Sequence, residues 1–360
     1  MNIAITGICG FVGSELALQL GRRFSGAKIA GIDNLSRPGS ETTRPRLRTA
    51  GVDVKHGDIR CPSDLEALGA ADWVIDAAAN PSVRAGVDGR TSSRQAVEHN
   101  LAGTLNVLEF CKERRAGLVL LSTSRVYSIT ALNALPLAVR GEAFGPDPSG
   151  AWPPGAWPPG ASPAGVAEDF STAAPLSLYG ATKLASEVMA LEYGDAFNLP
   201  IVIDRCGVLA GAWQFGTADQ GIYSYWVRAW MSGHRLAYLG FDGTGHQVRD
   251  ALHTEDLADL VERQMRAGQD ASGVWNAGGG PANAMSLAQL SGWCAERFGP
   301  QTVGVDRDGR KWDVPWLVMD AARARARFGW TPAISLARIL DEIAEHHRRH
   351  PDWLALTQPL

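Results

Sequence analysis

Short apolar runs alternate with longer amphipathic stretches through about residue 205 of the chain. The apolar runs predict six strands, at 3–6, 27–33, 52–56, 73–77, 117–122 and 200–205. The stretches between them predict helices that include 11–23, 94–114 and 179–193. Such alternation is typical of a parallel sheet with helices on both faces, whose ligands bind outside the carboxyl ends of its strands. We therefore expect an α/β fold with a doubly wound Rossmann-type domain over residues 1–204.

After residue 205 the pattern is less regular. It predicts strands near 235–239 and 274–277, and helices near 255–265, 287–298 and 336–347. We expect residues 205–360 to form mainly a smaller mixed α/β domain that binds substrate. Part of the segment 246–275 is expected to return to the first domain.

Residues 128–169 interrupt the alternation of strands and helices. This segment is rich in Pro, Gly and Ala, and it contains Ala-Trp-Pro-Pro-Gly twice, at 151–155 and 156–160. The composition predicts a loop rather than a strand or helix. Two interpretations stay open: a surface insertion, or a lid in which Trp152 or Trp157 covers the substrate.

The bulk composition is that of a compact globular protein. Of the 360 residues, 45% are hydrophobic and 20% charged, and the formal net charge is -4. Because there is no basic excess, we expect neither nucleic acid nor an anionic membrane as a partner. No run approaches the roughly 18 apolar residues of a membrane span.

Five scattered cysteines, at positions 9, 61, 111, 206 and 294, fit neither a disulfide framework nor a metal-binding pair. We therefore expect reduced thiols and no metal. The N-terminus begins with a strand rather than a cleavable apolar segment, which predicts a cytoplasmic protein. Near the other end, arginines accompany His346, His347 and His350, which favours a solvated helix end over a metal cluster.

The first strand and the first helix are joined by a glycine motif, Gly7, Gly10 and Gly13. Such glycines allow a tight turn whose free N–H groups hold a pyrophosphate. Asp33 ends the second strand about 20 residues later, where a carboxylate accepts hydrogen bonds from a ribose 2′-OH and repels a 2′-phosphate. The pattern favours NAD, although Arg37 leaves NADP open.

The third strand is followed directly by Asp58 and Ile59, which are also expected in the cofactor site. There Asp58 would hold the adenine or serve as a turn residue.

Tyr179 and Lys183 lie four residues apart at the start of a predicted helix, and therefore on one face of it. An ammonium group beside a phenol favours the phenolate and brings it closer to useful base strength. Thr123 follows the fifth strand, on the ligand side of the sheet. The three residues together predict a catalytic site.

In this order, these motifs resemble the extended short-chain dehydrogenase/reductase family over nearly the whole chain. The resemblance implies NAD as cofactor, a nucleotide-diphosphate sugar as substrate, and a homodimer built from the helices at 94–114 and 179–193. It also implies that Tyr179 takes a proton from a sugar hydroxyl, Thr123 orients that oxygen, and Lys183 holds the nicotinamide ribose.

The resemblance extends to further positions. The cofactor site is also expected to contain Cys9, Phe11, Val12, Asn34, Ser36, Ala77, Ala78, Ala79, Asn100, Ser122, Cys206 and Val208. The substrate site is expected to contain Pro81, Ser124, Arg125, Arg205, Gln214, Gln220, Arg249 and Arg310. Arg249 and Arg310 match family arginines that grip a pyrophosphate. The alternative is that each pairs only with a nearby acid, Asp250 or Asp313. Family members often carry histidine in place of Asp76, which leaves the hydrogen bonds there open.

The residues after Thr123 bear on the reaction. Nucleotide-sugar dehydratases of the family usually have Thr-Asp-Glu here, whereas this chain has Thr123-Ser124-Arg125. Without those two acids, elimination lacks its acid and base, and epimerisation through a transient keto sugar is favoured. Within the family, the segments at 33–37, 177–187, 204–208 and 247–253 most resemble those of the CDP-paratose 2-epimerase branch. A nucleotide-sugar 4-epimerase, an NAD(P)-dependent reductase or dehydratase, and a non-catalytic dinucleotide sensor stay as alternatives.

Overall fold

The computed structural model describes residues 1–87, 89, 92–147, 155, 157–307 and 312–356. Its centre is a seven-stranded sheet in which all neighbouring strands are parallel. The strands, in spatial order, are β14 (Gly273–Ala277), β10 (Ile201–Cys206), β5 (Gly117–Thr123), β4 (Trp73–Asp76), β1 (Asn2–Thr6), β2 (Lys28–Asp33) and β3 (Asp53–His56). The predicted α/β fold with a Rossmann-type sheet is confirmed, and the six strands expected before residue 205 start and end within one residue of their predicted bounds.

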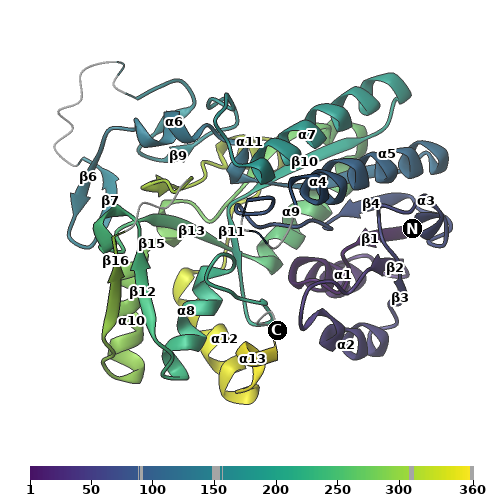
Figure 1. Cartoon of the computed structure of the whole chain (residues 1–360). Coiled ribbons are helices and arrows are strands. Elements are labelled where there is room, and N and C mark those ends of the chain that lie inside the picture. Colours follow the sequence, from purple (N-terminus) through teal and green to yellow (C-terminus); the bar gives the residue numbers. More distant parts are fainter. Residues whose placement is uncertain (88, 90–91, 148–154, 156, 308–311, 357–360) are drawn as a thin grey trace.

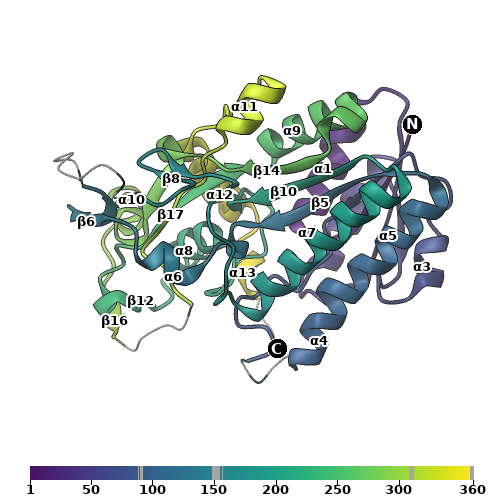
Figure 2. The same cartoon turned by 90° about the horizontal axis from the view of Figure 1, so that it is seen from above.

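Helices cover both faces of this sheet (Figure 2). On one side lie α3 (Pro62–Glu66), α5 (Gly103–Arg114) and α7 (Leu178–Phe197), and on the other α1 (Phe11–Arg23) and α9 (Thr254–Ala267). Alternate strand residues enter two separate cores: Ile3 and Ile5 pack with the α1 side, whereas Ala4 packs with the α5 side. This alternation follows from the period of two along a strand.

The chain returns to this sheet after residue 246. Helix α9 packs against α1, and β14 pairs with β10 at the edge of the sheet. Trp275, on β14, is buried in the core on the α1 side.

The predicted helix 94–114 is divided. It consists of α4 (Ser93–Val97), a π-helical turn at Glu98–Ala102, and α5. The turn aims Asn100 inward, where its amide accepts from the Asn80 backbone N–H (2.7 Å) and donates to the Asn80 carbonyl (3.1 Å). Turns of this kind occur frequently at functional sites.

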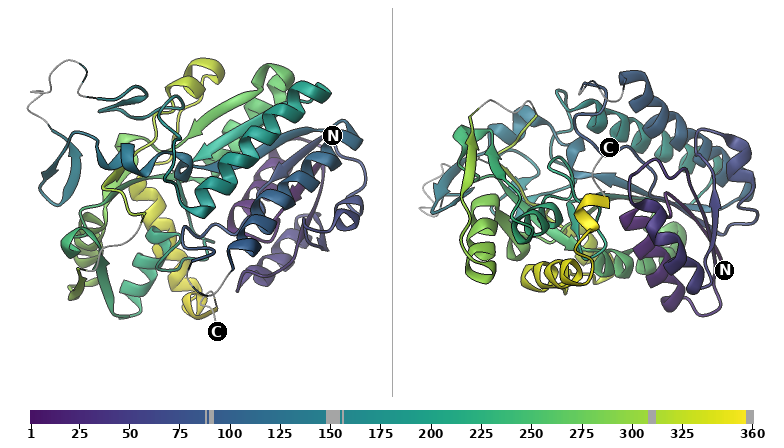
Figure 3. Two further views of the ribbon diagram at one scale, coloured as in Figure 1. Left: turned by 45° about the horizontal axis from the view of Figure 1, so that its top comes forward. Right: turned by 60° about the horizontal axis from the view of Figure 1, so that its bottom comes forward.

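The second half adds a smaller α/β unit (Figures 1 and 3). A second sheet contains β11 (Val208–Ala210), β13 (Val248–His253), β15 (Ala284–Ser286) and β17 (Trp316–Leu317), and β12 (Leu236–Leu239) pairs with β16 (Val303–Asp306). The helices of this half, apart from α9, are α8 (Ile222–Met231), α10 (Leu287–Phe298), α11 (Ala322–Phe328), α12 (Leu336–Arg349) and α13 (Trp353–Leu356). Four of them, α8, α10, α12 and α13, share one apolar core with Leu236 and Ala251.

The expectation of an unstructured loop over 128–169 is wrong for much of its described part. It contains α6 (Ile129–Asn133), a hairpin of β6 (Leu137–Arg140) and β7 (Ala143–Pro146), and a short pair of β8 (Ala161–Ser162) and β9 (Gly165–Val166). The reason is burial, because these elements form a core with the strand β17. Trp157 packs edge-on against Trp316, with ring centroids 6.2 Å apart, whereas Trp152 lies outside the described residues.

The end of α12 is solvated only in part: Arg348, Arg349 and His350 are exposed as expected, but the two preceding histidines are not. His346 and His347 are buried, and His346 contacts the rings of Trp213 and Trp353. Within the described part of the chain, no group of His, Cys, Asp or Glu is arranged to hold a metal ion. All five cysteines are free. None of the described helices combines the length and the apolarity that crossing a membrane requires.

Candidate active site

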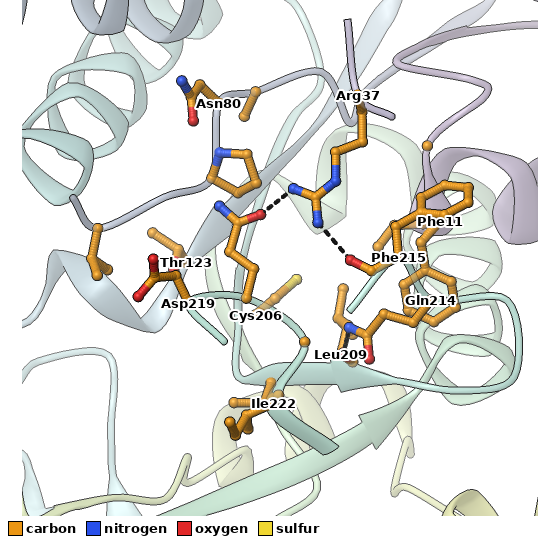
Figure 4. Close-up of a pocket in the computed structure, with 18 of the residues that line it drawn as sticks. Phe11, Arg37, Asn80, Thr123, Cys206, Leu209, Gln214, Phe215, Asp219 and Ile222 are labelled. Carbon is orange, nitrogen blue, oxygen red and sulfur yellow. Dashed lines mark hydrogen bonds between the residues drawn. The ribbon is translucent and has the colours of Figure 1, made fainter. Parts of the chain in front are cut away.

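A cavity of about 960 Å³ lies at the carboxyl ends of the central strands and is lined by residues from both halves of the chain (Figure 4). Its floor is the glycine turn and the ends of β2, β4 and β5, and its far wall comes from α8, β12 and β13. Ligand pockets commonly measure about 300–1,000 Å³, so the cavity has room for a large ligand or a pair of ligands.

The turn at the start of the cavity requires glycine. Gly7 has a φ of +62°, and a Cβ there would lie 2.9 Å from the Ala78 Cα. A Cβ on Gly13 would lie only 2.3 Å from the Gly7 carbonyl oxygen. Helix α1 begins with Gly10, which has no side chain to cap the first N–H groups. These N–H groups face the cavity turn and suit a pyrophosphate.

Asp33 is held at the end of β2 with its carboxylate oriented by the backbone. Its oxygens accept from the Cys9 N–H (2.9 Å) and the Leu35 N–H (2.8 Å). Burial raises the pKa of Asp33, and these hydrogen bonds oppose that rise. A carboxylate so placed accepts hydroxyl donors from a ribose and disfavours a second anion beside it.

Arg37 bridges the two halves of the chain. Its guanidinium donates to the side-chain oxygen of Gln220 and to the Phe215 carbonyl (2.5 Å), as Figure 4 shows. A second cross-link joins Arg84 to Asp219 at 3.7 Å. With its guanidinium engaged in this way, Arg37 gives no support to NADP.

The start of α7 positions Tyr179, the predicted catalytic base. Ser177 caps this helix by accepting from the Gly180 N–H at 3.0 Å. A Cβ on Gly180 would lie 2.3 Å from the Arg125 carbonyl, so only glycine lets the helix approach the turn after β5. Tyr179 and Thr123 are thereby brought to the same cavity wall.

The three predicted catalytic residues lie in a strongly desolvated place. Burial raises the pKa of Tyr179 to about 12, whereas a hydrogen bond with Thr123 and the charge of Arg125 oppose the rise. Lys183 is 1% exposed, and burial lowers its pKa. The carboxylates of Asp76 and Glu187 act in the opposite direction on this ammonium.

Asp76, whose hydrogen bonds the sequence left open, has partners of its own. It is fully buried and accepts from the hydroxyls of Thr6 (2.6 Å) and Thr104 (3.0 Å). The Thr6 hydroxyl also accepts from the Ala78 N–H at 3.2 Å. The hydrogen bonds that the sequence left open therefore tie β4 to β1 and to α5.

The expected role of Arg205 in substrate binding is wrong. Its side chain turns away from the cavity and pairs with Glu187 on α7 at 2.7 Å, both groups being almost completely buried. The remaining donor reaches the Glu168 carbonyl at 2.9 Å. Glu187 also accepts from Ser122, so this ion pair fixes the end of β5 and the helix that carries Tyr179.

The other expected substrate residues divide into two groups. Pro81, Ser124, Arg125, Gln214, Gln220 and Arg249 line the cavity. Arg310 lies outside the described residues. Arg249 does pair with an acid, Asp313, at 3.2 Å, although it remains part of the cavity wall. Asp250 instead accepts from the Gly280 N–H at 2.9 Å.

Comparison with known proteins adds to this geometry. A model of the NAD dependent epimerase/dehydratase family matches residues 3–278. The chain belongs to this family. Its cofactor is NAD, and the glycine turn, the open helix start and the oriented Asp33 carboxylate fit that group.

Curated relatives of this family member include enzymes with different reactions. CDP-paratose 2-epimerase of Salmonella typhi is 27% identical over 346 residues, which cover 93% of this chain and 96% of that protein. dTDP-glucose 4,6-dehydratase of Streptomyces niveus is 26% identical over 98% of this chain and 94% of that protein. The chain is also similar to a solved structure, that of UDP-glucuronic acid 4-epimerase from Bacillus cereus in complex with UDP-glucuronic acid and NAD. The match covers 97% of this chain and 100% of that one, with a TM-score of 0.74 and 22% identity. This similarity shows a common fold.

Most expected cofactor positions of this epimerase/dehydratase face the cavity. Besides Gly7, Gly10, Gly13, Asp33 and Arg37, they are Phe11, Val12, Asn34, Ser36, Asp58, Ile59, Ala77, Ala78, Ala79, Ser122, Tyr179, Cys206 and Val208. Cys9, Asn100 and Lys183 are buried behind this wall. Asp58 also stabilises the turn after β3, because its carboxylate accepts hydrogen bonds from the side chains of Arg60 (2.7 Å) and Asn34 (2.9 Å). The hydrogen bond from Arg60 lowers the pKa of Asp58.

Sequence reasoning missed several cavity residues. His99, in the π-helical turn, lines the cavity and has a buried Nδ1 without a hydrogen-bond partner. Asn80, Trp226, Arg235 and Gln247 line it as well. The π-helical turn has no sequence signature, so the position of His99 could not be read from periodicity.

Proposed function

We propose that this chain is an NAD-dependent epimerase of a nucleotide-diphosphate sugar, most similar in activity to CDP-paratose 2-epimerase. The observation that carries this proposal is the wall of the cavity after β5. Thr123 and Tyr179 lie there together, while the next two positions hold Ser124 and Arg125 rather than acids. That arrangement supports oxidation and reduction of a hydroxyl-bearing carbon, but it lacks the acid–base pair that drives loss of water.

In the proposed mechanism, the Thr123 hydroxyl holds the reacting sugar oxygen and Tyr179 takes its proton. NAD, when bound, would supply the chemistry that accepts and returns the hydride. Tyr179 would give its proton back to the sugar oxygen when the hydride returns to the opposite face of the keto sugar. Arg125 favours the phenolate, because a nearby cation favours the charged form of a tyrosine. Lys183 would hold the nicotinamide ribose and add its charge behind the phenol. Burial of these groups excludes water, which protects the keto sugar from side reactions.

Arg249 and its neighbours supply the binding energy for the nucleotide part. The guanidinium suits a pyrophosphate because its planar fork donates paired hydrogen bonds. Asp313 keeps this side chain in place from one side. A nucleotide-sugar 4-epimerase is the second candidate, since the solved 4-epimerase structure matches nearly the whole fold.

The test is an incubation of the NAD-loaded protein with CDP-, UDP-, GDP- and dTDP-sugars, followed by NMR of the sugar stereocentres. We expect inversion at one carbon with no net reduction of NAD. Inversion at C4 would select the second candidate. Stoichiometric NADH or a dehydrated keto sugar would replace the proposal with a dehydrogenase or a dehydratase. NAD binding without any turnover would indicate a sensor.

We also propose a homodimer formed by the helices at 94–114, which include α4 and α5, and by α7. Val188, Leu191 and Phe197 on α7 and Val97 on α4 leave large apolar side chains exposed, as expected of a face that a second copy covers. Light scattering should give twice the chain mass, and Val188→Glu should give monomers. Val305→Glu, at an equally exposed apolar residue on β16, should leave the dimer intact. A monomeric wild-type protein would contradict this proposal.

We further propose that the enzyme is located in the cytoplasm. Its free cysteines, exposed Cys61 among them, suit a reducing compartment. Fractionation of cells that produce the protein, with detection by antibody, tests this placement. Recovery outside the cytoplasmic fraction would contradict it.

A further inference from the structure

The loop between β11 and α8, residues 211–221, forms part of the cavity wall on the cofactor side. Gln214 and Phe215 of this loop line the cavity, and Figure 4 shows both near Phe11. Phe11 is the first residue of α1, directly after the glycine turn. The loop therefore adjoins the helix start that is expected to hold the pyrophosphate of NAD.

Two arginines link this loop to the cofactor half of the chain. Arg37 donates to the Phe215 carbonyl and to the side chain of Gln220. Arg84 pairs with Asp219 at 3.7 Å, but its side chain is half exposed, and exposed ion pairs contribute little. The polar link between the loop and the cofactor half therefore depends mainly on Arg37.

A further contact comes from helix α13, which packs against α8 (Figure 1). Its first residue, Trp353, is buried, and the indole N–H donates to the Gln214 carbonyl at 3.0 Å. The same ring stacks on Phe215, with centroids 5.3 Å apart and planes 16° from parallel, and meets Trp213 edge-on at 5.4 Å. One side chain of α13 thus contacts three successive residues of the loop.

The indole of Trp353 also joins the loop to α1. Phe11, Phe215 and Trp353 form an apolar cluster of their own, apart from the large cores of the two halves. The loop and α1 approach closely here, since a Cβ on Gly211 would lie 3.3 Å from the Phe11 ring. Trp353 is not among the described residues that line the cavity, so it acts on a bound ligand only through the loop.

Helix α13 is itself fixed to the smaller α/β unit. Leu354 is buried and lies in the core that α8, α10 and α12 share. The ring of Trp353 contacts that of His346 on α12, with centroids 4.9 Å apart. Trp353 therefore contacts the loop from a fixed support.

We propose that Trp353 is a positioning residue that holds the loop 211–221 closed beside bound NAD. Opening this part of the wall requires the loop to separate from Phe11, and Trp353 opposes that motion because it belongs to the cluster that joins them. Loss of its ring should therefore raise the rate at which the cofactor leaves. This inference goes beyond the proposed function and requires only that the cavity bind NAD.

The test measures release of NADH, whose own fluorescence changes when excess NAD displaces it from the protein in a stopped-flow instrument. We expect release to be about tenfold faster in Trp353→Leu, because this variant loses both the stacked ring and its hydrogen bond. Trp353→Phe keeps a ring to stack on Phe215 but loses the donor, and should release NADH at an intermediate rate. None of these rates depends on turnover of a substrate.

Trp275→Leu is the matched control. This tryptophan is also buried, and its indole N–H donates to a backbone carbonyl, that of Ala271, at 2.9 Å. It lies on β14, at the edge of the central sheet, and is not among the described residues of the cavity wall. Its replacement should lower the thermal unfolding midpoint yet leave the rate of NADH release within about twofold of wild type.

A second measurement uses the wild-type protein alone, so it decides the matter even if a variant fails to fold. Amide hydrogen exchange should slow on addition of NAD in both the loop 211–221 and α13. Protection of the loop without α13, or of neither segment, would overturn the assignment. So would release from Trp353→Leu within about twofold of wild type, or an equal acceleration in Trp275→Leu, which would trace the effect to lost stability.

Discussion

Asp204 tests how much burial raises the pKa of a carboxyl group in this fold, and how that rise changes the free energy of unfolding. It lies in the middle of β10, fully buried, and its Oδ1 accepts from Gln264 Nε2 on α9 at 2.7 Å. Two buried oxygens then remain without partners, Asp204 Oδ2 and Gln264 Oε1. A proton on Oδ2 would satisfy both at once, because a carboxylic acid and an amide pair through two hydrogen bonds. We predict that Asp204 is protonated in the folded protein at mildly acidic pH.

The cost of ionising this group can be worked out from its pKa. Burial raises the pKa of Asp204 from 3.8 to about 7. Since each pKa unit corresponds to about 1.4 kcal/mol, the protonated pair contributes about 4 kcal/mol. The folded pKa lies above the unfolded one, so this contribution is complete below about pH 4 and is lost as the pH rises to about 7. Asp204→Asn mimics the neutral acid and should stabilise the protein by up to about 4 kcal/mol at about pH 8.

The assay is urea unfolding of the NAD-loaded wild-type and variant proteins at several values between about pH 5 and pH 8. The advantage of Asp204→Asn should grow across this range. Asp256→Asn is the control: this buried carboxylate accepts from the N–H groups of Ala333 and Ile334, both at 3.0 Å, so its replacement should destabilise the protein. If Asp204→Asn is no more stable than wild type at pH 8, or its advantage is independent of pH, the reasoning is refuted.

Three other changes test the site. Arg37→Met removes the bridge to Gln220 and Phe215, and should speed release of NAD about tenfold in stopped-flow fluorescence; an unchanged rate would show that the bridge does not retain cofactor. Arg205→Met leaves Glu187 buried without its cation and should cost about 3–5 kcal/mol in urea unfolding, whereas a loss below about 1 kcal/mol would contradict the pairing. Burial raises the pKa of Asp33, so NAD affinity measured by calorimetry should fall as the pH is lowered into the acidic range, and a constant affinity would argue against a carboxylate contact with the ribose.

The parts of the structure that the sequence predicts well depend on local patterns. The bounds of α1 agree with its apolar spacing because the helix repeats every 3.6 residues over one buried face. The glycines of the first turn are equally local, since the close approach of Gly13 to Gly7 leaves no room for a side chain. Tyr179 and Thr123 could be paired because both follow directly from the strand and helix pattern around them.

The failures involve contacts between distant segments. The π-helical turn at Glu98–Ala102 accompanies the hydrogen bonds of Asn100 to Asn80, which periodicity does not encode. Arg205 was misplaced because a strand sends alternate side chains to opposite faces, and position in sequence does not say which face meets the ligand. The hairpin at 137–146 was missed because it is stabilised by a core with residues near 314–319.

The electrostatics of the cavity bear on how Tyr179 could act as a base. Burial opposes charge on Tyr179 and on Lys183, and it leaves the phenol with a pKa of about 12. The same burial makes any cation beside the phenol far more effective, because charges interact more strongly where water is absent. The charge of Arg125 already acts in this direction, and a positively charged cofactor bound beside the phenol would add to it. If Tyr179 is the base that we propose, it would gain strength when the cofactor is bound, and the ion pair of Arg205 with Glu187 would hold its helix in place.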